Sequence, residues 1–354
     1  MGGPLPFPSF YEADNAACAD YWPNQQRLLA DAERWRSRYA IAPSSTDRFN
    51  VHLLLVDMQK DFCLPEGSLF VAGRSGRGAL EDSRRIAEFI YRELGRITHI
   101  TTTLDSHLAY QIFSPSFWLG ADGRHPAPHR EINLADLEAG RFRPNPAVAP
   151  WVCNNDYEWL QRQVRYYCEE LEREGKYKLY LWPPHCIIGS DGHALVGLVH
   201  EARLFHDYVR QSQSWIEIKG NTPLTENYSV LRPEVLTRHD GGVLAEKNTR
   251  FLERLLEADA VLLAGQAASH CVRFTIEDLL SEISARDPRL AEKFYLLTDC
   301  MSCVAVADPK GGFAVDFTER TEKAFERFAA AGIRLVRSTE PLEGWPGLEG
   351  VFGS

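Results

Sequence analysis

The 354-residue sequence lacks a long apolar run and lacks an excess of positive charge. No stretch of about 20 consecutive apolar residues occurs, which excludes an ordinary membrane-spanning helix. The formal net charge is −10, and a protein that binds nucleic acid needs a basic face, so we expect no nucleic-acid partner. The first 20 residues contain neither the basic nor the apolar segment of a secretory signal. These absences together predict a cytoplasmic protein with no membrane partner.

Cysteine is too sparse for a disulfide scaffold. Eight cysteines are spread over the whole chain, whereas small secreted domains concentrate them. A reducing compartment is therefore expected. Cys300 and Cys303 form a CxxC pattern after a predicted strand, which leaves a redox role open, but incidental spacing is the preferred interpretation.

Short β-rich runs alternate with segments of helical periodicity. The expected strands are 52–56, 97–104, 214–218, 260–264, 294–298 and 333–336. The expected helices between them are 78–94, 193–207, 247–257, 273–284 and 319–331. Repeated units of this kind predict an α/β fold, a doubly wound and mostly parallel sheet of about six strands with helices on both faces.

The chain divides into an extension and one main domain. Residues 1–48 are an N-terminal extension with one expected helix, 25–39. Residues 49–345 are the main domain, which carries a long insertion at about 108–178. Its first part, Leu108 to Trp151, is expected to be irregular, with a helix at 156–174 after it. Because long ordered loops usually carry function, we favour a lid over the site or a subunit contact. An insertion without a function is left open as the alternative.

Four of the predicted strands stop at ionisable residues. They lead to Asp57, to the Asp105-Ser106-His107 triplet, to Lys219, and through a short turn to Cys271. Open parallel sheets bind ligands at the carboxyl ends of their strands, and buried charges are usually paired or functional. A helix begins just after Cys271, and a helix N-terminus stabilises a thiolate. The pattern therefore predicts one site with a cysteine nucleophile.

Five motifs resemble the nicotinamidase branch of the isochorismatase-like cysteine hydrolases. The resemblance covers roughly residues 49–341, with the motifs in the order of that family, and it implies an isochorismatase-like hydrolase fold. The connection between His107 and Trp182 is much longer here than is typical of that branch. The motifs are VDMQKDF from Val56, DSH from Asp105, WPPHC from Trp182, IKG from Ile218 and GQAASHC from Gly265.

The chemistry of these residues suits hydrolysis of an amide. Cys271 is the expected nucleophile, and Asp57 the base that becomes the acid for the leaving amine. Lys219 is expected to hold both Asp57 and the Cys271 thiolate in their charged forms, with a purely structural Asp57–Lys219 pair as the alternative. The backbone N–H of Cys271 is one expected oxyanion donor. The resemblance implies Ala267 as the other, with a cis peptide between Gln266 and Ala267.

Asp105, His107 and His185 form a ligand set with two imidazoles and one carboxylate. Such a set suits one divalent ion. Zinc is the ion expected first, and iron or manganese also fits. Some relatives carry a further histidine shortly after the DxH motif, where this chain has Gln111 to Phe113. A fourth protein ligand is therefore expected to be absent or replaced by water.

The resemblance also implies where the substrate lies. Phe62 and Trp182 match aromatic pocket positions of the family, and Tyr228 matches a third, although aromatic residues are often simply core. His270 neighbours Cys271 in sequence, but alternation points it away, so we interpret it as structural.

The expected function is a cysteine amidohydrolase with a small-molecule amide substrate. A nicotinamidase that acts through a Cys271 thioester, in NAD salvage, is the first hypothesis. A related hydrolase for another amide or a carbamoyl substrate is the alternative within the enzymes. A catalytically silent binding protein on the same fold is the alternative outside them. A homo-oligomer is left open.

Overall fold

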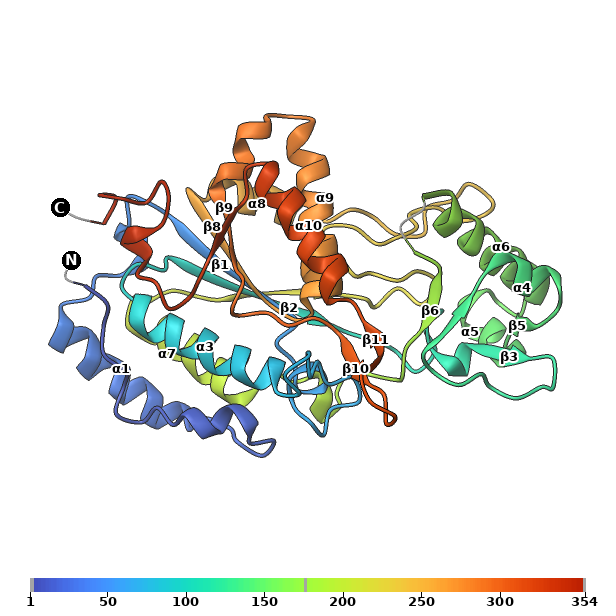
Figure 1. Cartoon of the computed structure of the whole chain (residues 1–354), viewed down its shortest axis with the longest axis horizontal. Helices are drawn as coiled ribbons and strands as arrows, with labels where there is room; N and C mark the ends of the chain where they lie inside the picture. Colours follow the sequence, from blue (N-terminus) through green and yellow to red (C-terminus); the bar gives the residue numbers. More distant parts are fainter. Residues whose placement is uncertain (1–2, 175–176, 353–354) are drawn as a thin grey trace.

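The computed structural model of the protein describes residues 3–174 and 177–352. A six-stranded sheet lies at its centre (Figure 1), with strand order β12-β9-β8-β1-β2-β7 and parallel pairing throughout. The strands are β1 (Val51–Val56), β2 (His99–Asp105), β7 (Trp215–Lys219), β8 (Ala260–Gly265), β9 (Phe294–Leu297) and β12 (Arg334–Val336). This arrangement confirms the predicted fold class.

Helices cover both faces of the sheet, so its central strands are apolar on both sides. In β1, Leu53 and Leu55 pack into the core on the α3 and α7 side. Leu54 and Val56 alternate with them and pack into the opposite core, as strand geometry requires. The helices on the first face are α1 (Gln25–Tyr39), α3 (Gly78–Glu93) and α7 (Gly197–Arg210), and those on the second are α8 (Thr249–Glu257), α9 (Arg273–Ser284) and α10 (Thr318–Ala330).

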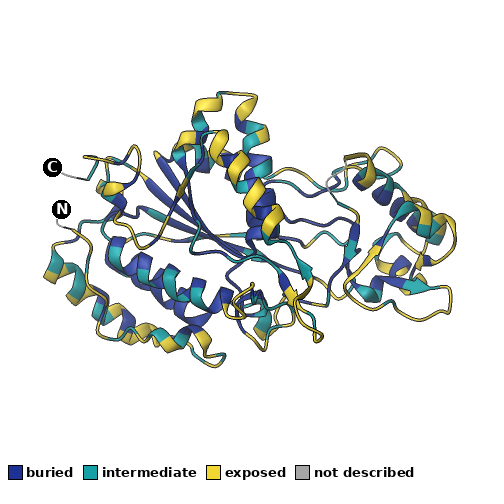
Figure 2. Ribbon diagram, viewed as in Figure 1, coloured by how far each residue is buried: buried dark blue, intermediate teal, exposed yellow. Residues whose placement is uncertain are grey.

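The N-terminal segment packs closely against the main domain. Helix α1 lies along α7, and its outer side is exposed (Figure 2). The fully buried guanidinium of Arg210 on α7 pairs with Asp47 and donates to the backbone oxygen of Ala42. Asp47 also accepts from the hydroxyl of Thr98 at 2.7 Å. The segment is thus held by buried polar contacts as well as by apolar packing.

The expectation that Leu108 to Trp151 is irregular is wrong. This part of the chain forms short elements that pack on α6 into a lobe beside the sheet (Figure 1). Two small antiparallel pairs, β3 with β5 and β4 with β6, satisfy its backbone groups. Strand propensity did not predict these strands from the sequence, because each is only a few residues long. The elements are β3 (Trp118–Gly120), β4 (Arg130–Ile132), α4 (Leu134–Glu138), β5 (Phe142–Pro144), α5 (Ala149–Val152), α6 (Tyr157–Glu174) and β6 (Leu179–Leu181).

Two further differences concern element boundaries and a hairpin. Helix α7 begins at Gly197, four residues later than expected, after a 3₁₀ turn at Asp191–His193. An antiparallel hairpin of β10 (Ala305–Ala307) and β11 (Phe313–Asp316) was not predicted. A short helix, α2 (Lys60–Cys63), follows β1. Among residues 3–174 and 177–352, no helix combines the length and apolar character that a bilayer span requires.

The contact between Asp47 and Arg210 predicts a large stability effect. We expect Asp47→Ala to lower the free energy of unfolding by about 3 kcal/mol, because it leaves a buried guanidinium without its carboxylate. Asp31→Ala is the matched control, since its partner Arg34 is 70% exposed, and it should cost less than about 1 kcal/mol. Urea unfolding measures both, and equal effects would contradict a stabilising role of the buried pair.

Candidate active site

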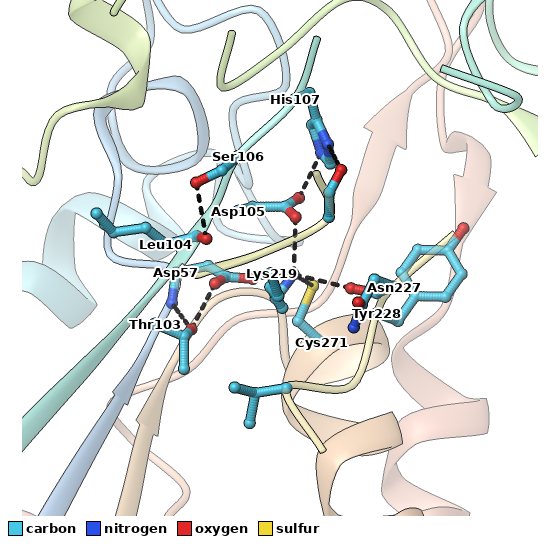
Figure 3. Close-up of polar contacts among 12 residues, drawn as sticks. Asp57, Thr103, Leu104, Asp105, Ser106, His107, Lys219, Asn227, Tyr228 and Cys271 are labelled. Carbon is cyan, nitrogen blue, oxygen red and sulfur yellow. Dashed lines mark hydrogen bonds and ion pairs between the residues drawn. The ribbon is translucent and has the colours of Figure 1, made fainter. Parts of the chain in front are cut away.

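Four strand ends bring the predicted catalytic residues together. Asp57 follows β1, Lys219 ends β7, and Asp105 ends β2 between them. Strand β8 leads through Gln266 and Ala267 into one turn of π-helix, Ala268–Val272, which carries Cys271. Figure 3 shows the side chains of Asp57, Asp105 and Cys271 meeting around Lys219. This convergence follows from the parallel sheet, whose strands all end at the same edge.

The loops at this edge need unusual backbone geometry. Asp57 has a φ of 47° and Gly220 a φ of 82°. A Cβ on Gly220 would lie 2.6 Å from Cε1 of His107 and 2.7 Å from Oδ1 of Asp105, so only glycine fits beside these two side chains. The Gln266–Ala267 peptide is cis, as the family resemblance implied.

Lys219 is the centre of the polar contacts. Its ammonium lies 2.9 Å from Oδ2 of Asp57 and 2.9 Å from Oδ1 of Asp105. It also lies 3.6 Å from Sγ of Cys271 and donates to the backbone oxygen of Asn227 at 3.1 Å. Burial alone would lower the pKa of Lys219, but the two carboxylates outweigh burial and raise it well above the ordinary value. The lysine is therefore a permanent cation.

Burial opposes the expected charge states of Asp57 and Cys271. Burial raises the pKa of Cys271 well above its usual range, and Lys219 only partly opposes that rise. Burial also raises the pKa of Asp57, against the same lysine and against a hydrogen bond of 2.5 Å from Thr103. That Lys219 holds both groups charged therefore stays a prediction. The two shifts favour a Cys271 thiol beside an Asp57 carboxyl of raised basicity.

Asp105, His107 and His185 come together beside this group. Their potential ligand atoms all lie within 4.8 Å of one another. Nε2 of His107 is 2.8 Å from Oδ2 of Asp105, and Nε2 of His185 is 3.5 Å from the same oxygen. Histidines that bind metals normally donate their other N–H to an acceptor behind them. Here Nδ1 of His107 bonds to the Gly220 oxygen at 3.0 Å, and Nδ1 of His185 to the Pro183 oxygen at 2.8 Å.

These contacts leave Nε2 of both histidines on the side of Asp105 Oδ2. Burial lowers the pKa of His107 although Asp105 opposes that shift, which favours the neutral imidazole that a metal ligand must be. Burial alone would raise the pKa of Asp105, but His107 and Lys219 lower it well below the ordinary value. The set therefore offers two imidazoles and one carboxylate, and it fits a divalent ion.

A cavity of about 400 Å³ opens onto these groups. Asp105, His185, Ala267 and Cys271 line it, and so do the three predicted pocket residues, Phe62, Trp182 and Tyr228. The other lining residues were not predicted; they are Leu69, Val71, Glu226, His270 and Val304. Burial and the charge of Asp105 raise the pKa of Glu226 to about 8, so this side chain is mostly a neutral acid at pH 7.

The expectation that His270 points away from the site is wrong. The segment is a helical turn, not a strand, so alternation does not apply. The His270 ring lines the cavity and lies 5.3 Å from Trp182 and 5.6 Å from Tyr228 between ring centroids. Burial lowers its pKa to about 3, with help from Arg273. His270 is thus a neutral wall residue and not a catalytic cation.

The insertion lies behind the metal-ligand set. Phe113 packs 4.7 Å from His107 and 6.1 Å from His185 between ring centroids. Gln111 donates to the Gly220 oxygen at 2.7 Å. None of the described residues that line the cavity belongs to Leu108–Trp151. The structure therefore supports this stretch as a support for the ligand residues and not as a lid directly over the cavity.

Several supporting residues could have been found from periodicity. Thr103 lies two residues before Asp105 on β2, so both side chains share one face of that strand. Its hydroxyl oxygen accepts from the Asp57 N–H at 2.9 Å. Asn227 acts through its backbone oxygen, and no sequence signal identifies such a role.

Comparison with known proteins finds nicotinamidases and pyrazinamidases. No family model matches the sequence. The chain is 30% identical to the nicotinamidase of Escherichia coli (strain K12) over 102 residues, which is 28% of this chain and 39% of that enzyme. The matched segment thus spans well under half of the E. coli relative.

Solved structures of nicotinamidases and pyrazinamidases are similar to this chain at low sequence identity and with TM-scores below 0.5. An Acinetobacter baumanii nicotinamidase and pyrazinamidase is 19% identical with a TM-score of 0.47, over 83% of this chain and 99% of that one. The yeast nicotinamidase bound to the inhibitor nicotinaldehyde is 19% identical with a TM-score of 0.49, over 81% and 99%. The Pyrococcus horikoshii pyrazinamidase in complex with zinc is 19% identical with a TM-score of 0.42, over 81% and 99%.

Proposed function

We propose that the protein is a cysteine amidohydrolase that converts nicotinamide and water to nicotinate and ammonia. The observation that carries this proposal is the contact of one lysine with a thiol and two carboxylates, beside a possible metal-ligand set in a cavity lined by aromatic residues. A carboxamide is a poor electrophile, so its hydrolysis needs a nucleophile, a proton for ammonia and a stabilised oxyanion. Each of these has a candidate in the cavity.

The first half-reaction uses Cys271 and Asp57. The Cys271 thiol transfers its proton to Asp57 as Sγ bonds to the carboxamide carbon, and Lys219 stabilises the thiolate that develops. The backbone N–H groups of Ala267 and Cys271 would receive the oxyanion. Asp57 then gives the proton to the nitrogen, the C–N bond breaks, ammonia leaves, and a thioester remains on Cys271. The raised pKa of Asp57 suits both transfers near neutral pH.

The second half-reaction reverses the roles of the same groups. Asp57, again a carboxylate, takes a proton from water as the water oxygen bonds to the thioester carbon. Collapse of the tetrahedral intermediate breaks the C–S bond, and Sγ regains its proton from Asp57. The acid product ionises, and the site returns to its starting state. No group outside the cluster of Asp57, Lys219 and Cys271 has to move a proton.

The rest of the cavity suits a pyridine ring. Phe62, Trp182 and Tyr228 supply aromatic surface for the ring. A divalent ion held by Asp105, His107 and His185, with zinc the first expectation, would attract the pyridine nitrogen and fix the position of the carboxamide. The alternative of another amide or carbamoyl substrate keeps Asp57, Lys219 and Cys271 in the same roles. A silent binding protein, the other alternative, would not need the contacts of Lys219 with Asp57, Asp105 and Cys271.

Substitution of the nucleophile or the base should remove turnover. We expect Cys271→Ala to abolish ammonia release, and Asp57→Asn to lower kcat by at least about a thousandfold, since Asp57 acts in both half-reactions. Binding of nicotinamide to Cys271→Ala, measured by calorimetry, should persist because the ring contacts remain. Cys18→Ala, which removes an exposed thiol, is the control and should keep full activity. An Asp57→Asn enzyme within a few fold of wild type would remove Asp57 from the mechanism.

The ring nitrogen should decide between substrates. Benzamide has the ring and the carboxamide of nicotinamide but no pyridine lone pair, so kcat/KM should fall by roughly 10- to 100-fold or more. Picolinamide should also be poor, because its nitrogen is misplaced relative to the amide. An ammonia-release assay measures all three. Equal rates for benzamide and nicotinamide would contradict recognition through the nitrogen. Turnover of other amides alone would favour the alternative hydrolase.

The ligand set should hold one divalent ion per chain. Dialysis against a strong chelator should remove the ion and the activity while the melting temperature changes little, because the large sheet does not depend on one ion. Metal content measured by mass spectrometry should fall to background in His107→Ala, His185→Ala. His125→Ala, an exposed histidine of the insertion, is the control. Unchanged metal content in the double variant would mean that the ligands are misassigned.

A further inference from the structure

A second cavity of about 540 Å³ lies beside the catalytic one. It is bounded by β4 and β6 of the insertion lobe on one side and by the beginnings of α9 and α10 on the other (Figure 1). Trp182, Tyr228 and His270 line both cavities, so they form a wall between them. Trp182 donates its indole N–H to the Tyr228 hydroxyl at 2.8 Å within this wall. We call this second space the side chamber.

The insertion builds one face of the side chamber by strand alternation. Lys178, Tyr180 and Trp182 are two residues apart along β6 and its end, so they share a face, and all three line the chamber. Glu131 of β4 lies directly opposite Tyr180 in the antiparallel pair and lines it too. The chamber therefore exists because of the insertion, and no residue of the proposed catalytic reaction requires it.

Aromatic rings form much of the chamber surface. Tyr180 lies 4.5 Å from Trp182, and Phe317 lies 4.8 Å from His270, between ring centroids. On the α9 side, Phe274 stacks on Tyr228 at 5.3 Å. A cavity lined by several rings suits a planar aromatic ligand, which gains both apolar burial and ring contacts.

Three cationic side chains and one carboxylate line the chamber, and the cations also have partners of their own. The four residues are Lys178, Arg273, Arg320 and Glu131. Lys178 and Glu131 are 3.7 Å apart and both about half exposed, a pair that contributes little. Arg273 is 8% exposed and donates its Nε–H to Glu277 at 2.9 Å, which uses one of the five donors of a guanidinium.

The helices beside the chamber have no free N-terminus. Helix α9 continues directly from the π-helical turn Ala268–Val272, and the first N–H of α10, that of Thr318, donates to Asp316 at 2.9 Å. The cationic side chains therefore supply the positive charge at the chamber. The arginines also act on His270 in the wall. Burial lowers the pKa of His270 most, and the charges of Arg273 and Arg320 lower it further.

We propose that the side chamber is a second binding site, specific for a planar aromatic carboxylate. The ring would lie among Tyr180, Phe274 and Phe317, and the carboxylate would face Arg273 and Arg320. A neutral amide lacks the charge that these arginines select, so the site discriminates between an aromatic acid and its amide. The inference does not depend on the proposed reaction, because it concerns equilibrium binding outside the catalytic cavity.

Calorimetry with benzoate tests the proposal on the full-length protein. Benzoate should bind more tightly than benzyl alcohol, which has the ring without the charge, and more tightly than acetate, which has the charge without the ring. Arg320→Gln and Arg273→Gln should each weaken benzoate binding by roughly tenfold, the effect of one lost charged hydrogen bond. Arg327→Gln is the matched control, since Arg327 lies on α10 and contacts Glu277 but does not line the chamber.

Two outcomes would overturn the proposal. One is benzoate affinity that is unchanged in Arg320→Gln, whose exposed position makes it safe for folding even where Arg273→Gln is unstable. The other is a crystal soaked with 4-iodobenzoate in which the anomalous signal of iodine lies only in the catalytic cavity. Iodine density between Tyr180 and Phe317, together with weaker binding in the arginine variants, would support it. Neither measurement uses turnover, so a failure here is distinct from a failure of the proposed function.

Discussion

The contact of the buried Lys219 ammonium with two carboxylates is the interaction on which the site depends. Asp57 and Asp105 are both almost fully buried, and two carboxylates in one apolar space would each resist ionisation. One cation 2.9 Å from each of them offsets part of that cost. The energetics of buried ion pairs makes such an arrangement poor evidence for stability, and its position at the sheet edge indicates that it serves chemistry.

Because Lys219 is shared, the thiol and the metal-ligand set are not independent. Asp105 uses Oδ1 for the lysine and Oδ2 for the histidines. A divalent ion on the Oδ2 side would withdraw negative charge from Asp105 and weaken its hold on Lys219. The lysine would then stabilise Asp57 and the Cys271 thiolate more strongly. In the structure, burial raises the pKa of both groups, and Lys219 opposes both shifts.

Sequence predicted the parts of this arrangement that follow from the parallel sheet. Asp57, Asp105, Lys219 and Cys271 had to converge, because strands that run the same way end at one edge. The helical turn that aims His270 into the cavity was not predictable, since alternation assumes an extended chain. The pKa shifts were not predictable either: a motif shows which charged residues are neighbours, whereas the pKa of Cys271 is shifted first by burial.

The short elements of the insertion were also not predicted from the sequence. Its elements are three to five residues long outside α6, too short for periodicity to identify, and each is held by partners distant in sequence. Strand β6 links this lobe to the catalytic cavity, because the chain passes from β6 into Trp182 and then His185. The same four residues, Trp182 to His185, therefore join the wall of the side chamber to a residue of the candidate metal site.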